Sequence, residues 1–101
     1  MLDDRFYLIS LYDFYKGLLT SKQREYFELS YFDDYSLSEI AEQFNVSRAA
    51  VYDAIQKINK ELLNYEQALN LKAKSNKRLL LINEISDESI KQELLDLEQN
   101  N

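Results

Sequence analysis

Polar side chains between Ser47 and Gln56 have the types and the spacing needed to read the edges of DNA bases. Arg48 can donate two hydrogen bonds to a guanine, Gln56 can bond to an adenine, and the methyl group of Ala49 can meet that of a thymine. Asp53 can accept a hydrogen bond from a cytosine or simply repel a phosphate. The candidates for base-edge contacts are therefore Ser47, Arg48, Ala49, Tyr52, Asp53 and Gln56.

Basic side chains are candidates for contacts to the phosphate backbone, which dominate the affinity of DNA-binding proteins. These candidates are Lys22, Arg24, Lys57 and Lys60, although lysines on an exposed helix more often face only solvent. A separate run, residues 72–78, contains four basic residues in seven. It is either a solvated linker or a second phosphate-contacting patch for DNA or structured RNA.

Catalytic and metal chemistry are not favoured by this sequence. It has no cysteine, no histidine and one glycine, so it lacks a cysteine- or histidine-based nucleophile system, the cysteine and histidine ligands of metal sites and a glycine-rich phosphate loop. The pairs Asp3-Asp4 and Asp33-Asp34 fit helix boundaries, where aspartate caps a helix or forms a turn, better than a metal site. We predict that the protein is not an enzyme and has no catalytic residue, no metal and no cofactor.

The net charge of −6 counts against nucleic-acid binding, but the charge is unevenly distributed. Residues 1–35 contain four basic and seven acidic residues, and residues 61–101 contain five and eight. Residues 36–60 are balanced, with three of each. The neutral part of the chain is thus the part that carries the base-edge candidates.

No stretch of this sequence is apolar enough to cross a membrane. The longest nearly uninterrupted apolar run is residues 79–82, whereas a membrane-spanning helix needs about 20 such residues. Asp3 and Asp4 stand where a signal peptide would carry lysines. We expect a cytoplasmic protein that does not insert into a membrane.

The elements that position the candidate residues are predicted to be helices throughout. The sequence has no proline and is 46% hydrophobic, a composition that favours an all-α fold with a packed core. Gly17 is expected to stop the first helix, and Ser86 to cap the last one. Apolar periodicity and capping residues predict this first helix over residues 5–19 and the following helices over residues 21–32, 36–43 and 47–71.

Two helix starts only eleven residues apart predict a helix-turn-helix over residues 36–60. Ser36 forms a capping box with Glu39, and Ser47 caps the following helix. Asn45 stands at the turn position that needs a positive φ. The residues expected to fill the crease between the two helices are Ile40, Phe44, Val46, Val51 and Ala54, with Ala41 at the closest approach.

The helix that starts after Ser47 is expected to be unusually long. Its apolar residues alternate spacings of four and three from Val51 to Leu69, and the basic run 72–78 is expected to loosen or bend it. This pattern predicts a helical domain over residues 1–71 and a C-terminal helical extension over residues 72–101.

Apolar side chains in the first helix and in the long helix exceed what one small chain is expected to cover. A homodimer would bury them and would pair two reading heads for adjacent half-sites. The alternative is that other helices of the same chain cover them. The dimer-interface candidates are Phe6, Ile9, Phe14, Leu62, Tyr65 and Leu69.

The stretch LTSKQREYFELSYFDDYSLSEIAEQFNVSRAAVYDAI resembles region 4 of bacterial sigma factors, a DNA-reading helix-turn-helix without a wing. Residues 5–75 as a whole are more similar to the YlxM family of small bacterial helix-turn-helix proteins. That resemblance implies a regulator that binds double-stranded DNA and is linked to the signal recognition particle pathway. The alternative is a module that binds the particle's GTPase or RNA without reading DNA, which the acidic net charge favours.

Overall fold

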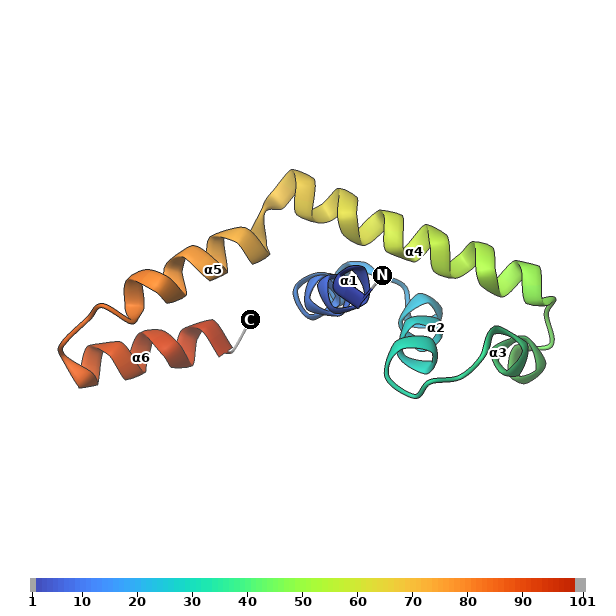
Figure 1. The fold of residues 1–101 in the computed structure, drawn as a ribbon, viewed down its shortest axis with the longest axis horizontal. Helices are drawn as coiled ribbons and strands as arrows, with labels where there is room; N and C mark the ends of the chain where they lie inside the picture. Colours follow the sequence, from blue (N-terminus) through green and yellow to red (C-terminus); the bar gives the residue numbers. More distant parts are fainter. Residues whose placement is uncertain (1, 100–101) are drawn as a thin grey trace.

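A computed structural model describes residues 2–99 of the chain, with side chains described for residues 4–99. All regular elements in this range are helical, which confirms the predicted all-α fold (Figure 1). The elements are α1 (Leu2–Tyr15), the short 3-10 helix η1 (Lys16–Leu18), α2 (Ser21–Tyr31), α3 (Leu37–Phe44), α4 (Arg48–Leu69), α5 (Leu71–Ile82) and α6 (Glu88–Gln99).

The hydrophobic core lies where α1, α2 and α3 pack against the long helix α4. Phe27 of α2 is fully buried at its centre, with its ring stacked between those of Tyr12 and Tyr31 at centroid distances of 4.3 Å each. Val51, Ile55, Ile58 and Leu62 form the buried apolar stripe of α4. The first four α-helices therefore share one core, and α4 is its common support.

Side-chain caps start α2, α3 and α4 where the sequence predicts them. The capping boxes of Thr20 with Gln23 and of Ser36 with Glu39 are both complete, and the Ser47 hydroxyl accepts a hydrogen bond at the start of α4. The pKa of the Glu39 carboxyl is lowered from its usual value, mainly by the hydrogen bond that the Ser36 backbone N–H donates to it and, to a smaller extent, by the Ser36 hydroxyl. These local bonds fix the ends of α2, α3 and α4 independently of the core.

The first and last helices differ in detail from the sequence prediction. Gly17 does not end an α-helix; it lies within η1, after α1 has ended at Tyr15. Asp87, and not Ser86, caps α6, because its carboxylate accepts hydrogen bonds from the backbone N–H groups of Ser89 and Ile90. Aspartate and serine are both favoured caps, so their order in the sequence did not decide between them.

The break after α4 also differs from the prediction. The basic run 72–78 does not loosen a helix, because it lies within α5. The chain instead turns at Asn70, which has φ 56° and ψ 31° in the left-handed region. Asparagine is the residue other than glycine that most readily adopts this conformation, so one residue is enough to separate α4 from α5.

A buried carboxylate fixes the junction between α4 and α5. Glu66 accepts hydrogen bonds from the backbone N–H groups of Lys72 and Ala73 at 3.1 Å each and from the Tyr15 hydroxyl at 2.5 Å. The Tyr15 hydroxyl oxygen in turn accepts a bond from the backbone N–H of Leu71 at 3.0 Å. The N-terminus of α5 is thus capped by two side chains from other helices.

The pKa values at this junction shift in the directions its hydrogen bonds require. Burial opposes ionisation of Glu66, but the bonds from Tyr15, Lys72 and Ala73 outweigh it, and the carboxyl pKa is lowered from 4.5. Burial, together with the bond to Glu66, raises the pKa of Tyr15 from 10.0 to about 12.

Stability should therefore fall at alkaline pH. The neutral form of Tyr15 is favoured in the folded state, so its contribution is complete below pH 10 and is lost as the pH rises toward about 12. Urea unfolding between pH 8 and pH 11 measures this loss. Because Tyr15→Phe cannot ionise at this position, the variant should show a shallower decline above pH 10 than the wild type. If stability declined equally with pH in the two proteins, ionisation of Tyr15 would not be the cause of the alkaline loss.

α5 and α6 form an antiparallel hairpin that extends away from the four-helix core (Figure 1). Glu98 of α6 forms an ion pair with Arg78 and accepts a hydrogen bond from the Ser75 hydroxyl at 2.9 Å. The whole molecule is elongated, with extents of 55 × 25 × 24 Å. The hairpin and the helix-turn-helix consequently lie at opposite ends.

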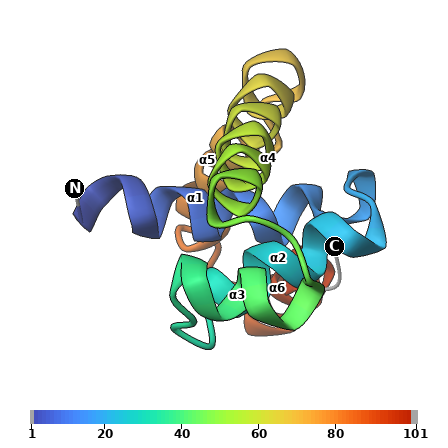
Figure 2. The same ribbon diagram turned by 90° about the vertical axis from the view of Figure 1, so that its right-hand side faces the viewer.

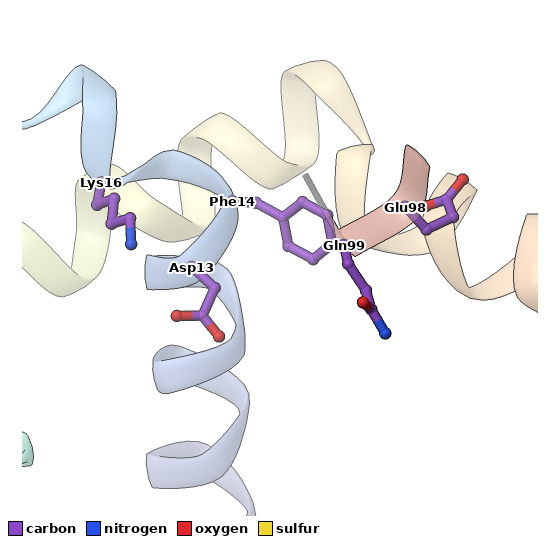
Figure 3. A pocket seen from close by; sticks show the side chains of 5 residues that line it. All are labelled: Asp13, Phe14, Lys16, Glu98 and Gln99. Carbon is purple, nitrogen blue, oxygen red and sulfur yellow. The ribbon is translucent and has the colours of Figure 1, made fainter. Parts of the chain in front are cut away.

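The end of α6 returns to the end of α1, where a pocket of about 320 Å³ opens between them (Figure 3). The ring of Phe14 points toward Gln99, whereas Glu98 turns away from Asp13 and Lys16 (Figure 3). The polar groups around this pocket do not converge on one point. The pocket lies between the hairpin and the core, and its polar side chains are not arranged as a catalytic site would require.

Candidate nucleic-acid interface

The turn between α3 and α4 has the geometry of a helix-turn-helix. Asn45 adopts the left-handed conformation, with φ 55° and ψ 49°, as its place in the sequence predicts. The backbone N–H of the next residue, Val46, reaches back to the carbonyl oxygen of Ala41 at 3.0 Å. This bond closes the end of α3 and reverses the chain before Ser47 starts α4.

The crease between α3 and α4 is filled largely as predicted. Ile40 and Val51 are completely buried, and Ala41 is buried at the crossing. Phe44 is half-buried and meets the ring of Tyr26 edge to face. Ala54 is also half-buried against the core.

Val46 is less buried than the sequence predicts. Its side chain is 37% exposed. The left-handed Asn45 carries the chain out of α3, and Val46 and Ser47 then continue in the turn at the surface of the helix pair. Val46 consequently leaves part of an apolar side chain exposed next to the start of α4.

The N-terminal end of α4 is presented outward, and Figure 2 looks onto this end of the molecule. The Ser47 hydroxyl accepts a hydrogen bond from the Ala50 N–H at 3.0 Å. The first N–H groups of a helix have no acceptor within it and carry partial positive charge. All six base-edge candidates are exposed: Ser47, Arg48, Ala49, Tyr52, Asp53 and Gln56.

These six residues do not all lie on the same side of α4. Helical periodicity places Ala49 and Asp53 opposite the buried stripe, facing directly outward. Gln56 lies on the flank nearest α1, where it lines a groove of about 310 Å³ with Asp4 and Tyr7. The most outward position near the helix start is thus occupied by an acidic residue.

The structure brings two of the phosphate candidates together. Lys22 at the start of α2 and Lys57 of α4 line the same pocket, of about 220 Å³, between the two helices. The Lys22 ammonium also lies 5.8 Å from the ring centre of Tyr26 and 5.9 Å from that of Phe44. The sequence predicts both lysines as phosphate contacts, but only the packing of α2 against α4 shows that they are neighbours.

The other two phosphate candidates are separate from this pair. Lys60 is exposed farther along α4. Arg24 is half-buried, and its guanidinium donates hydrogen bonds to the backbone carbonyls of Lys16 at 3.2 Å and Leu19 at 2.6 Å. Arg24 therefore closes the end of η1, a role in the fold that sequence reasoning missed.

The dimer-interface candidates do not form one exposed patch. Phe6 is 66% exposed and Leu69 is also exposed, whereas Ile9, Phe14 and Tyr65 are half-buried against the core. Leu62 is completely buried, so its predicted place in an interface is wrong. Helices of the same chain cover most of this apolar surface.

Two further observations concern metals and membranes. Among the side chains that the structure describes, those of residues 4–99, no three acidic groups come close enough to hold a metal ion. Within the same range, no helix is both long and apolar enough to span a membrane.

Comparison with known proteins places the chain in a family. It is 50% identical over 93 residues to a UPF0122 protein of Ureaplasma urealyticum serovar 10, covering 92% of this chain and 94% of that protein. It is 48% identical over 92 residues to one of Halalkalibacterium halodurans, covering 91% and 84%, and 47% identical over 90 residues to one of Mycoplasma capricolum, covering 89% and 80%. The model of the UPF0122 family, described as "Putative helix-turn-helix protein, YlxM / p13 like", matches residues 2–100. The chain therefore belongs to the UPF0122 family of YlxM-like helix-turn-helix proteins.

Proposed function

We propose that this protein binds double-stranded DNA as a regulator, with the start of α4 as its reading element. The observation that carries the proposal is the left-handed turn at Asn45, which leaves the N-terminal end of α4 exposed beyond α3. Membership in a helix-turn-helix family supports it. In this role the protein acts by binding and not by catalysis.

In the proposed complex, the first turns of α4 enter the major groove and α3 crosses the phosphate backbone. Arg48 is the side chain proposed to recognise a guanine, and the N–H groups that follow Ser47 lie near a phosphate. Lys22 and Lys57 contact the backbone on the α2 side. Asp53 limits binding to sites where it meets a cytosine, because elsewhere it repels phosphate.

Replacing Arg48 with alanine should weaken binding to the preferred DNA site by about 5- to 150-fold, the usual value of a bidentate contact to guanine. The site is first selected from random duplex DNA at low salt, and affinities are then measured by fluorescence anisotropy. Circular dichroism should be unchanged, because Arg48 is exposed.

Lys74→Ala provides the matched control, because it also removes one exposed positive charge but lies on α5. We expect it to leave affinity nearly unchanged. Loss of binding in Lys74→Ala but not in Arg48→Ala would move the nucleic-acid contact to the basic run 72–78. Absence of binding by the wild type at low salt would refute the proposal.

A second candidate function is binding to the GTPase or the RNA of the signal recognition particle. The acidic net charge of −6 favours a protein partner over a purely DNA-directed role. A pull-down from bacterial lysate, with and without nuclease, separates the candidates. Retention of the particle's GTPase after nuclease treatment would support this alternative, and recovery of DNA alone would exclude it.

A further inference from the structure

We propose that the α5–α6 hairpin is the dimerisation element, and that it pairs with the hairpin of a second copy of this chain to form a four-helix bundle. An apolar groove of about 500 Å³ runs between α5 and α6 on one face of the hairpin. It is lined by Arg78, Leu81, Ile82, Ile85, Leu94, Leu97 and Glu98.

The two helices of the hairpin cannot bury all the apolar side chains that line this groove. Leu81 is 60% exposed and Leu97 is 68% exposed, although both lie on the face where the two helices meet. A pair of helices buries only the side chains directly between them. A second pair packed on this face encloses the remaining apolar side chains, as in four-helix bundles.

The charges of the two helices indicate that the second pair is another copy of this chain. α5 contains four basic residues and no acidic residue, whereas α6 contains four acidic residues and one basic residue. The hairpin is therefore complementary to itself when α5 of one copy faces α6 of the other. A two-fold interface provides this match twice, because each contact is repeated by symmetry.

The same charges select one of the two ways to stack the hairpins. If the two-fold axis is perpendicular to the helices, α5 of one copy faces α5 of the other. The four basic residues of one α5 would then face the four basic residues of the other and repel them. With the axis parallel to the helices, each α5 faces α6 of the other copy. This arrangement puts both interhelical loops at one end of the bundle and both helix-turn-helix units at the other.

Charged residues at the outer edges of the groove fit this arrangement. Lys77 precedes Leu81 by four residues on α5, and Glu93 precedes Leu97 by four residues on α6, so each lies one turn from a groove leucine on the same side of its helix. In the proposed bundle, Lys77 of each copy lies beside Glu93 of the other.

The first test compares leucines inside and outside the groove by sedimentation equilibrium of the full chain. The wild type should have twice the mass of the 12.0 kDa chain at concentrations on the order of 100 μM. Leu97→Glu should raise the dissociation constant at least 30-fold, since it places a charge in the interface. Leu80→Glu is the matched control, because Leu80 is 70% exposed on α5 and does not line the groove.

The second test exchanges the charges. Lys77→Glu and Glu93→Lys should each weaken the dimer, and the double variant should restore it, because the attractive pair is re-formed with opposite signs. A monomeric wild type at this concentration, equal effects of Leu97→Glu and Leu80→Glu, or no restoration in the double variant would overturn the proposal. None of these measurements involves DNA, so their outcome is independent of the proposed function.

Discussion

Replacing Glu66 with alanine should lower the free energy of unfolding by about 3 kcal/mol. The substitution removes the shared acceptor of the Tyr15 hydroxyl and of the backbone N–H groups of Lys72 and Ala73. These donors would remain at a largely buried site without their carboxylate, and an unsatisfied buried donor costs about 1–3 kcal/mol. Urea denaturation followed by circular dichroism measures the loss.

Two further variants identify the cause. Glu66→Gln keeps the size of the side chain and one acceptor oxygen, so it should cost about half as much as Glu66→Ala. Gln67→Ala alters the exposed neighbour on α4 and should change stability by less than about 0.5 kcal/mol. A loss below 1 kcal/mol in Glu66→Ala would show that the α4–α5 junction does not depend on this carboxylate.

Replacing Phe27 with alanine should cost about 3–5 kcal/mol, a large part of the stability of a domain this size. Phe27 is completely buried, and its ring stacks on Tyr12 and Tyr31. Truncation leaves a cavity between α1 and α2 and removes both aromatic contacts. Because α2 packs on α3 and α4, the helix-turn-helix should lose its thermal stability together with the core.

Phe6→Ala is the matched control for this experiment. It removes the same ring from a position that is largely exposed on α1, so the melting temperature should hardly change. Differential scanning calorimetry of the three proteins gives the comparison. If Phe27→Ala and Phe6→Ala melted within a few degrees of each other, Phe27 would not lie in the core of the domain.

Local signals explain why much of this fold could be predicted from the sequence. Thr20, Ser36 and Ser47 cap helices through bonds that span three residues, and Asn45 supplies a turn that few other residues tolerate. The periodicity of α4 fixes which of its side chains face outward. Exposure of the base-edge candidates follows directly from that periodicity.

The features that could not be predicted depend on contacts between distant residues. Glu66 and Tyr15 are 51 positions apart, and nothing in the local sequence distinguishes Glu66 from a solvated glutamate. The same limit applies to Arg24, whose capping role depends on where η1 ends, and to the pairing of Lys22 with Lys57. Asn70 is a residue type that favours a left-handed turn, but the basic run that begins two residues later is the stronger sequence signal for a break. The predicted break therefore lies in the basic run and not at Asn70.

The most direct test of the proposed DNA-reading surface is an NMR titration of isotopically labelled protein with the duplex selected from random DNA. We expect amide shift changes to concentrate between Ser47 and Gln56 and at Lys22, with little change at α6, and to diminish as salt is added. Changes confined to α5 and α6, or no change at low salt, would contradict the account, because the start of α4 would then not be the surface that meets DNA.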